Sequence, residues 1–375
     1  MNTEQALTEK ETHKKHTFTR VFLIASSILL AYSVAVFAAG ILSADFAEVY
    51  SEGISSYIRR FLALLTFALP FSLTEALVFI LPLAAAVLLI RALVMHFKYK
   101  KKAVSLYFVR LFTVILLLAS LFINSFGICY KRYDLADKME LDVRDISSED
   151  VFRTAAIMSA LAERVSPSVI YNSDGSSHMP YDFRTMHEKI KAGYEKTLYN
   201  VPRVFSVKPV ALSEPWTYTH ISGMYMPLTG ESNVNVNYPD FVITFSTAHE
   251  MAHQMGYASE DEANFLAFLA CINSGDDYLV YSAALNAVDY LFSDLGGIAS
   301  TFIMDNLDVC SRGELRAYSA FFAKYRNSKA SVVTSEINDS YLKSLGVTDG
   351  VQNYSKVSEL IVAYMIKKYP HLYQK

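Results

Sequence analysis

The chain has 375 residues, enough for two or three domains of ordinary size. Hydrophobic residues make up 52% of it, charged residues only 19%, and the mean hydropathy is +0.22. These values exclude a wholly soluble or disordered chain and place part of it in lipid. The net charge of −3 argues against a nucleic-acid partner, and three scattered cysteines form neither a disulfide framework nor a thiolate metal site.

Three apolar segments in the first third of the chain predict transmembrane helices at about 21–44, 72–96 and 106–129. The first is uncharged throughout, and at 1.5 Å per residue it is long enough to cross a hydrocarbon core about 30 Å thick. Between the first two spans, an amphipathic stretch at about 54–69 is expected to form a helix at the membrane interface. Residues 1–130 are therefore expected to be a membrane anchor that contacts lipid.

The lysines and arginines of the short loops predict the orientation of this anchor. The tail before the first span and the loop after the second are rich in them, whereas the loop between the first two spans has Arg59 and Arg60 set against three acids. Because basic loops stay on the cytoplasmic side, the N-terminus is expected in the cytoplasm of a multi-pass cell-membrane protein. The domain formed by residues 131–375 is then extracytoplasmic.

Residues 131–375 are expected to be one mainly helical domain with a small β-sheet, so the fold class is membrane-anchored α+β. Amphipathic patterns predict helices near 148–165, 183–199, 277–294, 312–327 and 352–369. Between Pro202 and Tyr238 the composition changes and predicts short β-strands at 204–210, 223–230 and 233–237.

The sequence His249-Glu250-Met251-Ala252-His253 matches the HExxH pattern. On a helix, residues four apart project from one face, so both imidazoles can hold one Zn²⁺ while Glu250 acts on the bound water. The segment 244–246 offers capping chemistry for the start of this helix, and Gly256 stands where it would end.

A zinc hydrolase needs a third protein ligand, and two residues compete for this role. Glu260 begins a Glu-x-x-Ala-Asn sequence that resembles the helix supplying the third ligand in gluzincin peptidases, with Asn264 as a support that orients a ligand. Glu262 is the alternative, although a capping box with Ser259 would occupy its carboxylate. The number of residues between His253 and Glu260 is small for a gluzincin and nearer that of a metzincin. However, Ser259 stands where a metzincin has its third histidine ligand.

The chain as a whole resembles an uncharacterised bacterial family of membrane-anchored zincin-like proteins with three N-terminal spans and an extracytoplasmic HExxH domain. The motifs that carry the resemblance are Tyr50-Ser51-x-Gly53, Pro70-Phe71-Ser72, 223–235, 249–256 with 260–265, 338–343 and 349–351. The resemblance implies a zinc metallopeptidase.

The residues themselves predict a mechanism in which Glu250 is the general base for a zinc-activated water that attacks a peptide bond. The segment 223–235 is expected to bind the peptide or protein substrate along a strand edge, through Gly223, Tyr225, Asn233 and Asn235. The candidates for stabilising the oxyanion are Tyr218, His220, Tyr257 and Tyr290, and the sequence does not choose among them.

Two other functions compete with a surface peptidase. Cleavage inside the bilayer would require the HExxH motif to lie in a span, but the apolar run 265–272 is far too short for one. A catalytically silent zinc-binding scaffold or sensor is the remaining alternative, and it would not need the Glu250 that the chain has.

Overall fold

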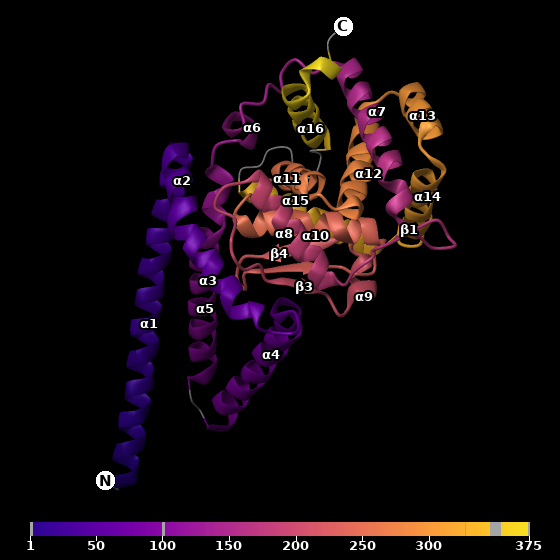
Figure 1. Ribbon diagram of the computed structural model, residues 1–375. Coiled ribbons are helices and arrows are strands. Elements are labelled where there is room, and N and C mark those ends of the chain that lie inside the picture. Colours follow the sequence, from indigo (N-terminus) through magenta and orange to yellow (C-terminus); the bar gives the residue numbers. More distant parts are fainter. Residues whose placement is uncertain (1–2, 100–101, 327, 346–353, 374–375) are drawn as a thin grey trace. The chain divides into compact units, whose positions relative to one another are not determined.

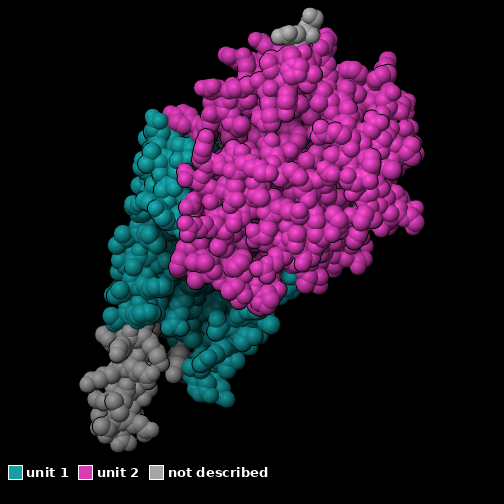
Figure 2. Space-filling model, in the orientation of Figure 1, with its two compact units in different colours: residues 1–58, 73–132 teal, residues 59–72, 133–375 magenta. Residues whose placement is uncertain are grey.

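The computed structural model describes residues 3–99, 102–326, 328–345 and 354–373, and the motif at 349–351 lies outside them. The chain is mostly helical, with two small sheets (Figure 1). It divides into two compact units, formed by residues 1–58 with 73–132 and by residues 59–72 with 133–375 (Figure 2).

The first unit contains three helices that are long and apolar enough to cross a membrane, as the sequence predicted. They are α1 (Thr3–Leu42), α4 (Leu73–Tyr99) and α5 (Ala103–Ser125), and in α1 the spanning part is Thr17–Leu42. The shorter elements of this unit are α2 (Ala44–Tyr50), a π-helical turn η1 (Ser51–Ser55) and a 3₁₀ turn η2 (Gly127–Lys131).

Polar side chains join the helices of the first unit at Asn124 near the end of α5. The Asn124 side-chain amide donates to Ser33 Oγ of α1 at 2.7 Å and accepts from Tyr50 Oη of α2 at 2.6 Å. Ser55 Oγ donates to the Asn124 carbonyl at 2.5 Å. A buried polar network that is fully paired fixes one arrangement of the helices that it joins.

The second unit contains the helices that follow residue 132. They are α6 (Leu135–Lys138), α7 (Ser148–Val165), α8 (Phe183–Thr197), α9 (Ser213–Thr217), α10 (Asp240–Met255), α11 (Glu260–Asn273), α12 (Asp277–Asp294), α13 (Gly297–Asn306), α14 (Val309–Ala323), α15 (Lys329–Ser344) and α16 (Tyr354–Lys368), with 3₁₀ turns η3 (Ser166–Ser168) and η4 (Pro370–Leu372). Each of the five predicted helices matches one of these, and α6, α9, α13 and α15 were not predicted.

The helix α3 (Ser56–Phe67) lies where the sequence predicted an interface helix, but the structure groups it differently from our expectation. From Arg59 to Ser72 the chain belongs to the second unit and not to the anchor. The stripe of Arg59, Ala63 and Thr66 is buried, whereas the large apolar side chains of Phe61, Leu64 and Leu65 are exposed. The apolar stripe that suggested an interface helix is therefore the outer face of α3.

The three-stranded sheet of the second unit has the order β3-β5-β4, with β3 (Val207–Pro209), β4 (Gly223–Met226) and β5 (Glu231–Val234). β3 pairs with β5 in parallel, and β4 pairs with β5 antiparallel, so that Tyr225 lies opposite Ser232. β4 is thus an outer strand. A separate antiparallel pair joins β1 (Ile170–Tyr171) to β2 (Ser177–His178).

The core of the second unit lies where α10, α11 and α12 meet, with α7, α8 and α16 around them (Figure 1). From Phe265 to Cys271, α11 is completely buried, and α10 packs on the β4–β5 hairpin. A helix that is buried on all sides is held by its neighbours, so α10 and α11 are rigid supports for the side chains they carry.

Candidate metal centre

The helix α10 carries the HExxH residues. It begins at Asp240, and not after 244–246 as the sequence suggested, because Pro239 and Asp240 supply the start: the Pro239 carbonyl accepts from the Val242 and Ile243 amides. Thr244 lies inside the helix, where its hydroxyl donates back to the Asp240 carbonyl. Gly256 ends the helix with φ of 98°, a left-handed conformation that glycine adopts readily, as predicted.

The first turn of α11 places Glu260 opposite the two histidines. Glu260 Oε2 lies 3.1 Å from His249 Nε2 and 3.6 Å from His253 Nε2. One ligand atom from each of these residues lies within 4.8 Å of the others. The His253 side chain is only 8% exposed, whereas that of Glu260 is 44% exposed, so the cluster is open to solvent on the Glu260 side.

The spacing of these three atoms fits a tetrahedral zinc ion. Ligands about 2.0–2.1 Å from such an ion lie about 3.4 Å apart, close to the observed distances from Glu260 to both histidines. Two imidazoles and one carboxylate also form a ligand set of catalytic zinc sites, in which the fourth position is left for water. The residues present therefore fit the metal that the sequence predicted.

Hydrogen bonds at the far side of each ring leave the Nε2 atoms available to a metal. His249 Nδ1 lies 2.7 Å from Asn264 Oδ1, and His253 Nδ1 lies 2.7 Å from the Tyr257 carbonyl oxygen. Because both oxygens are acceptors, each Nδ1 carries the proton and donates it. Asn264 thus has the place expected of it, and Tyr290 Oη donates to the same Oδ1 at 3.0 Å.

Metal binding at this cluster is coupled to proton release, because Glu260 favours the protonated form of His253 when no metal is bound. Burial lowers the pKa of His253, but the neighbouring Glu260 carboxylate outweighs this effect and raises it to about 9. Burial alone would raise the pKa of Glu260, yet the two histidines hold it well below its usual range. Glu260 is therefore a carboxylate at neutral pH, as a metal ligand must be.

Glu250 projects from the same helix and lies against the outer strand β4. Its side chain is buried, and its Oε2 has no hydrogen-bond partner among the described residues. A Cβ atom built on Gly223 would lie only 2.6 Å from Glu250 Oε1, so a glycine is needed for this close approach. Burial raises the pKa of Glu250, while the nearby histidines lower it.

Glu262 is directed elsewhere. Its Oε1 accepts a hydrogen bond from the Leu135 amide at 2.5 Å, and burial raises its pKa to about 7. The capping box that we expected with Ser259 is not formed, because the Ser259 hydroxyl donates to Asp261. In the structure, Glu260 and not Glu262 approaches the histidines.

The asparagines expected to contact substrate use their side chains inside the second unit. Asn233 donates to the Met224 and Glu231 carbonyls and accepts from Ser72. Asn235 donates to Thr217 and to the Ile221 carbonyl. Tyr225, in contrast, lies on β4 and donates a backbone hydrogen bond to Glu250.

The structure separates the four residues considered for stabilising the oxyanion. His220 faces the Tyr325 carbonyl at 2.7 Å, and Tyr218 packs edge-on against the Tyr325 ring. Tyr257 and Tyr290 are linked to the metal cluster through His253 and Asn264. The sequence missed this support by Tyr290, because no local pattern joins it to a residue 26 positions earlier.

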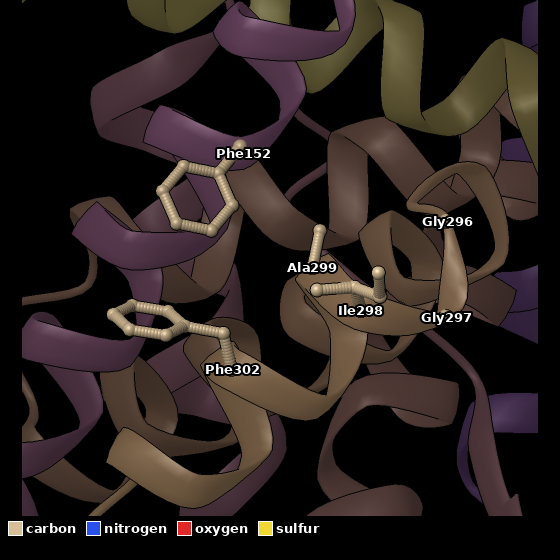
Figure 3. Close-up of a pocket in the computed structure, with 6 residues that line it drawn as sticks. All are labelled: Phe152, Gly296, Gly297, Ile298, Ala299 and Phe302. Carbon is tan, nitrogen blue, oxygen red and sulfur yellow. The ribbon is translucent and has the colours of Figure 1, made fainter.

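A hollow on another part of the second unit is apolar (Figure 3). Its lining comes from α7 and from α13 with the residues before it: Phe152, Gly296, Gly297, Ile298, Ala299 and Phe302. None of these side chains can bind a metal or move a proton. The hollow therefore has no part in the chemistry of the cluster.

Comparison with known proteins places the chain in a family but gives no activity. No curated protein and no solved structure matches the chain. The zincin-like resemblance accordingly stays a prediction. The family described as "Protein of unknown function (DUF3810)" matches residues 50–362, and the chain belongs to this family.

Proposed function

We propose that the protein is a zinc-dependent peptidase of the cell membrane with a zincin-like domain outside the cytoplasm. The observation that carries the proposal is the cluster of His249, His253 and Glu260, with the buried and incompletely bonded Glu250 on the same helix. In the HExxH pattern the two histidines bind the metal, and the glutamate between them in the sequence is free for proton transfer.

Zinc bound at this cluster supplies a Lewis acid that polarises a carbonyl and lowers the pKa of bound water to about 7. Glu250 accepts the proton of the attacking water and then donates it to the leaving amine. Burial supports both steps, because it raises the pKa of the Glu250 carboxyl and so makes the protonated form accessible. Asn264 and the Tyr257 carbonyl hold the two imidazoles in the required orientation.

The outer strand β4 supports an extended peptide as the substrate. Main-chain groups on an outer strand can pair with an added strand. Since Glu250 lies so close to β4 that a Cβ on Gly223 would overlap its carboxylate, a peptide paired with β4 would pass beside the general base. The exposed side of Glu260 leaves the cluster open for such a substrate.

The orientation across the membrane is part of the proposal. Basic residues in the loop between α4 and α5, and in the tail before α1, favour the cytoplasmic side for both. With three spans, the chain after α5 is then outside. In a Cys310→Ser background, which removes the exposed native thiol, a cysteine introduced at the exposed Ile298 should therefore react with a membrane-impermeant maleimide in intact cells. Labelling only after lysis would show that this domain lies on the cytoplasmic side of the membrane.

The test is zinc content and cleavage of a mixed peptide library by the full-length protein in detergent. We expect one zinc per chain and cleavage that Glu250→Gln abolishes without loss of metal. Glu260→Gln should lower zinc binding, while the matched change Glu262→Gln should not, because Glu262 bonds to Leu135. Bound zinc without cleavage of any peptide would favour the silent scaffold, and absence of zinc would refute the metal centre.

A further inference from the structure

The segment 59–72 stands in the sequence between two membrane-spanning helices, yet it is built into the unit that carries the metal cluster. Thr66 Oγ1 donates to Ser206 Oγ at 2.9 Å, and Ser72 Oγ donates to Asn233 Oδ1 at 2.6 Å. The Lys208 ammonium donates to the carbonyls of Phe67 and Leu69. The segment is therefore bonded along its length to β3, β5 and the residues beside them.

Two glycines allow α3 to pack closely against the rest of this unit. A Cβ on Gly230, in the turn between β4 and β5, would lie 2.6 Å from the Ala63 amide nitrogen. A Cβ on Gly256, at the end of α10, would lie 2.3 Å from Arg59 Nη2. Both glycines have positive φ, of 71° and 98°. Side chains at either position would separate α3 from the hairpin or from the metal helix.

Arg59 is the side chain of α3 that reaches the metal helix. It is only 2% exposed, its guanidinium lies on the Cα face of Gly256, and its Nη2 donates to the Met255 carbonyl at 3.0 Å. The last carbonyls of a helix carry partial negative charge and lack partners within the helix. A buried guanidinium at this point therefore stabilises the final turn of α10.

That final turn also orients one of the metal ligands. The Gly256 amide donates to the His253 carbonyl at 2.9 Å, and the Tyr257 amide donates to the Ala252 carbonyl at 3.2 Å. These bonds position the Tyr257 carbonyl, which accepts the Nδ1 proton of His253. A displaced turn would rotate this acceptor and, with it, the His253 ring.

We propose that Arg59 is a positioning residue of the metal centre, which acts through Met255, Gly256 and the Tyr257 carbonyl to hold His253 in its ligating orientation. This inference rests on the metal centre proposed above. It means that a residue located between two membrane spans belongs to the site. A lysine at position 59 would keep the positive charge but lose the planar guanidinium that lies against Gly256. It should therefore preserve the orientation of His253 only in part.

The test compares zinc affinity, by competition with a chelator, for the full-length protein in detergent at a temperature where all variants are folded. Arg59→Gln should weaken zinc binding by about 10-fold or more, as loss of a group that orients a ligand does, and Arg59→Lys should weaken it less. The matched control is Arg60→Gln, because Arg60 is exposed and donates to the Asn200 carbonyl instead. Its affinity should stay within twofold of the wild type.

A second control separates positioning from general stability. Met158→Ala opens a cavity in α7, in the core of the second unit, and lowers the melting temperature of the metal-free protein. Its zinc affinity should be unchanged. With Co²⁺ as the probe, Arg59→Gln should also alter the visible absorption bands that report ligand geometry, whereas Met158→Ala should not.

Each failure has its own signature. Equal zinc affinity in Arg59→Gln and the wild type, or equal weakening by Met158→Ala, would overturn the positioning role and leave the metal centre intact. A wild type that binds no zinc would overturn the metal centre and this inference with it. Zinc binding without peptidase activity, weakened by Arg59→Gln, would support the inference while refuting the proposed reaction.

Discussion

Replacement of Gly223 by alanine should damage the proposed general base without removing the metal. The new Cβ would lie 2.6 Å from Glu250 Oε1, 2.7 Å from its Cγ and 2.9 Å from its Cδ. An ordinary contact is about 3.5 Å, so the strand and the carboxylate must separate by roughly 0.9 Å. Glu250 is buried and Gly223 is half-buried, and we expect the change to lower the free energy of unfolding by about 1–3 kcal/mol.

The effect on catalysis should be larger than the effect on stability. Misplacement of a catalytic group by about 1 Å lowers the rate roughly 10²-fold, which corresponds to about 2.7 kcal/mol in the activation barrier. Zinc content should remain at the wild-type level, because the three atoms nearest to the new Cβ all belong to Glu250 and not to a proposed ligand. The assay is kcat/KM on a peptide cleaved in the library, together with zinc content and the melting temperature.

Gly296→Ala is the matched control. It introduces the same methyl group where no atom lies within 4 Å, at a backbone conformation that alanine adopts easily. Its activity should equal that of the wild type. A Gly223→Ala enzyme with kcat/KM within twofold of the wild type would refute the close approach of β4 to Glu250. Loss of zinc together with activity would show that the change acts on the ligands instead.

Three other changes have defined outcomes. Asn264→Ala should weaken zinc binding about 10–100-fold, measured by chelator competition, because His249 loses the acceptor of its Nδ1 proton. The fragment 133–375 should melt at a lower temperature than the same fragment with the segment 59–72 joined to it by a flexible linker. Equal melting temperatures would contradict the hydrogen bonds between this segment and the rest of the second unit. Burial raises the pKa of Glu314 from 4.5 to about 7, so the folded state binds more protons than the unfolded state in that window, and Glu314 should contribute a fall of about 3 kcal/mol in the free energy of unfolding as the pH rises through it. In denaturant titrations of the metal-free protein at pH 4.5 and pH 8, Glu314→Gln should show a fall smaller than that of the wild type by about this amount, while the contribution of Glu262, whose pKa burial also raises to about 7, remains in both proteins.

The metal cluster was predictable because its geometry is local. His249 and His253 are one helical turn apart, and Glu260 begins the next helix after the Gly256 turn. Asn264 stands one turn after Glu260, so its approach to His249 followed from the same periodicity. The three apolar helices were predictable for a similar reason, since length and composition alone define them.

The structure departs from the sequence reading where distant parts of the chain meet. We expected the metal helix to begin after the capping residues 244–246, but it begins at Asp240, where the Pro239 carbonyl accepts from the Val242 and Ile243 amides. We expected α3 to be an interface helix, whereas its stripe of Arg59, Ala63 and Thr66 is buried in the second unit. The close packing of this stripe depends on the left-handed turns at Gly230 and Gly256, which no sequence pattern near α3 predicts.

The bond between Arg59 and Met255 also has a consequence for biosynthesis. The two residues are 196 positions apart, and translation at about 5–20 residues per second separates their emergence by about 10–40 s. Until Ser206 has been synthesised, Thr66 of α3 lacks the hydroxyl to which it later donates, while α1 and α4 on both sides of α3 in the sequence have already been made. The second unit can therefore be completed only after the first two apolar helices have been synthesised. A cut anywhere between α5 and α7 would release a domain that lacks one of its own helices.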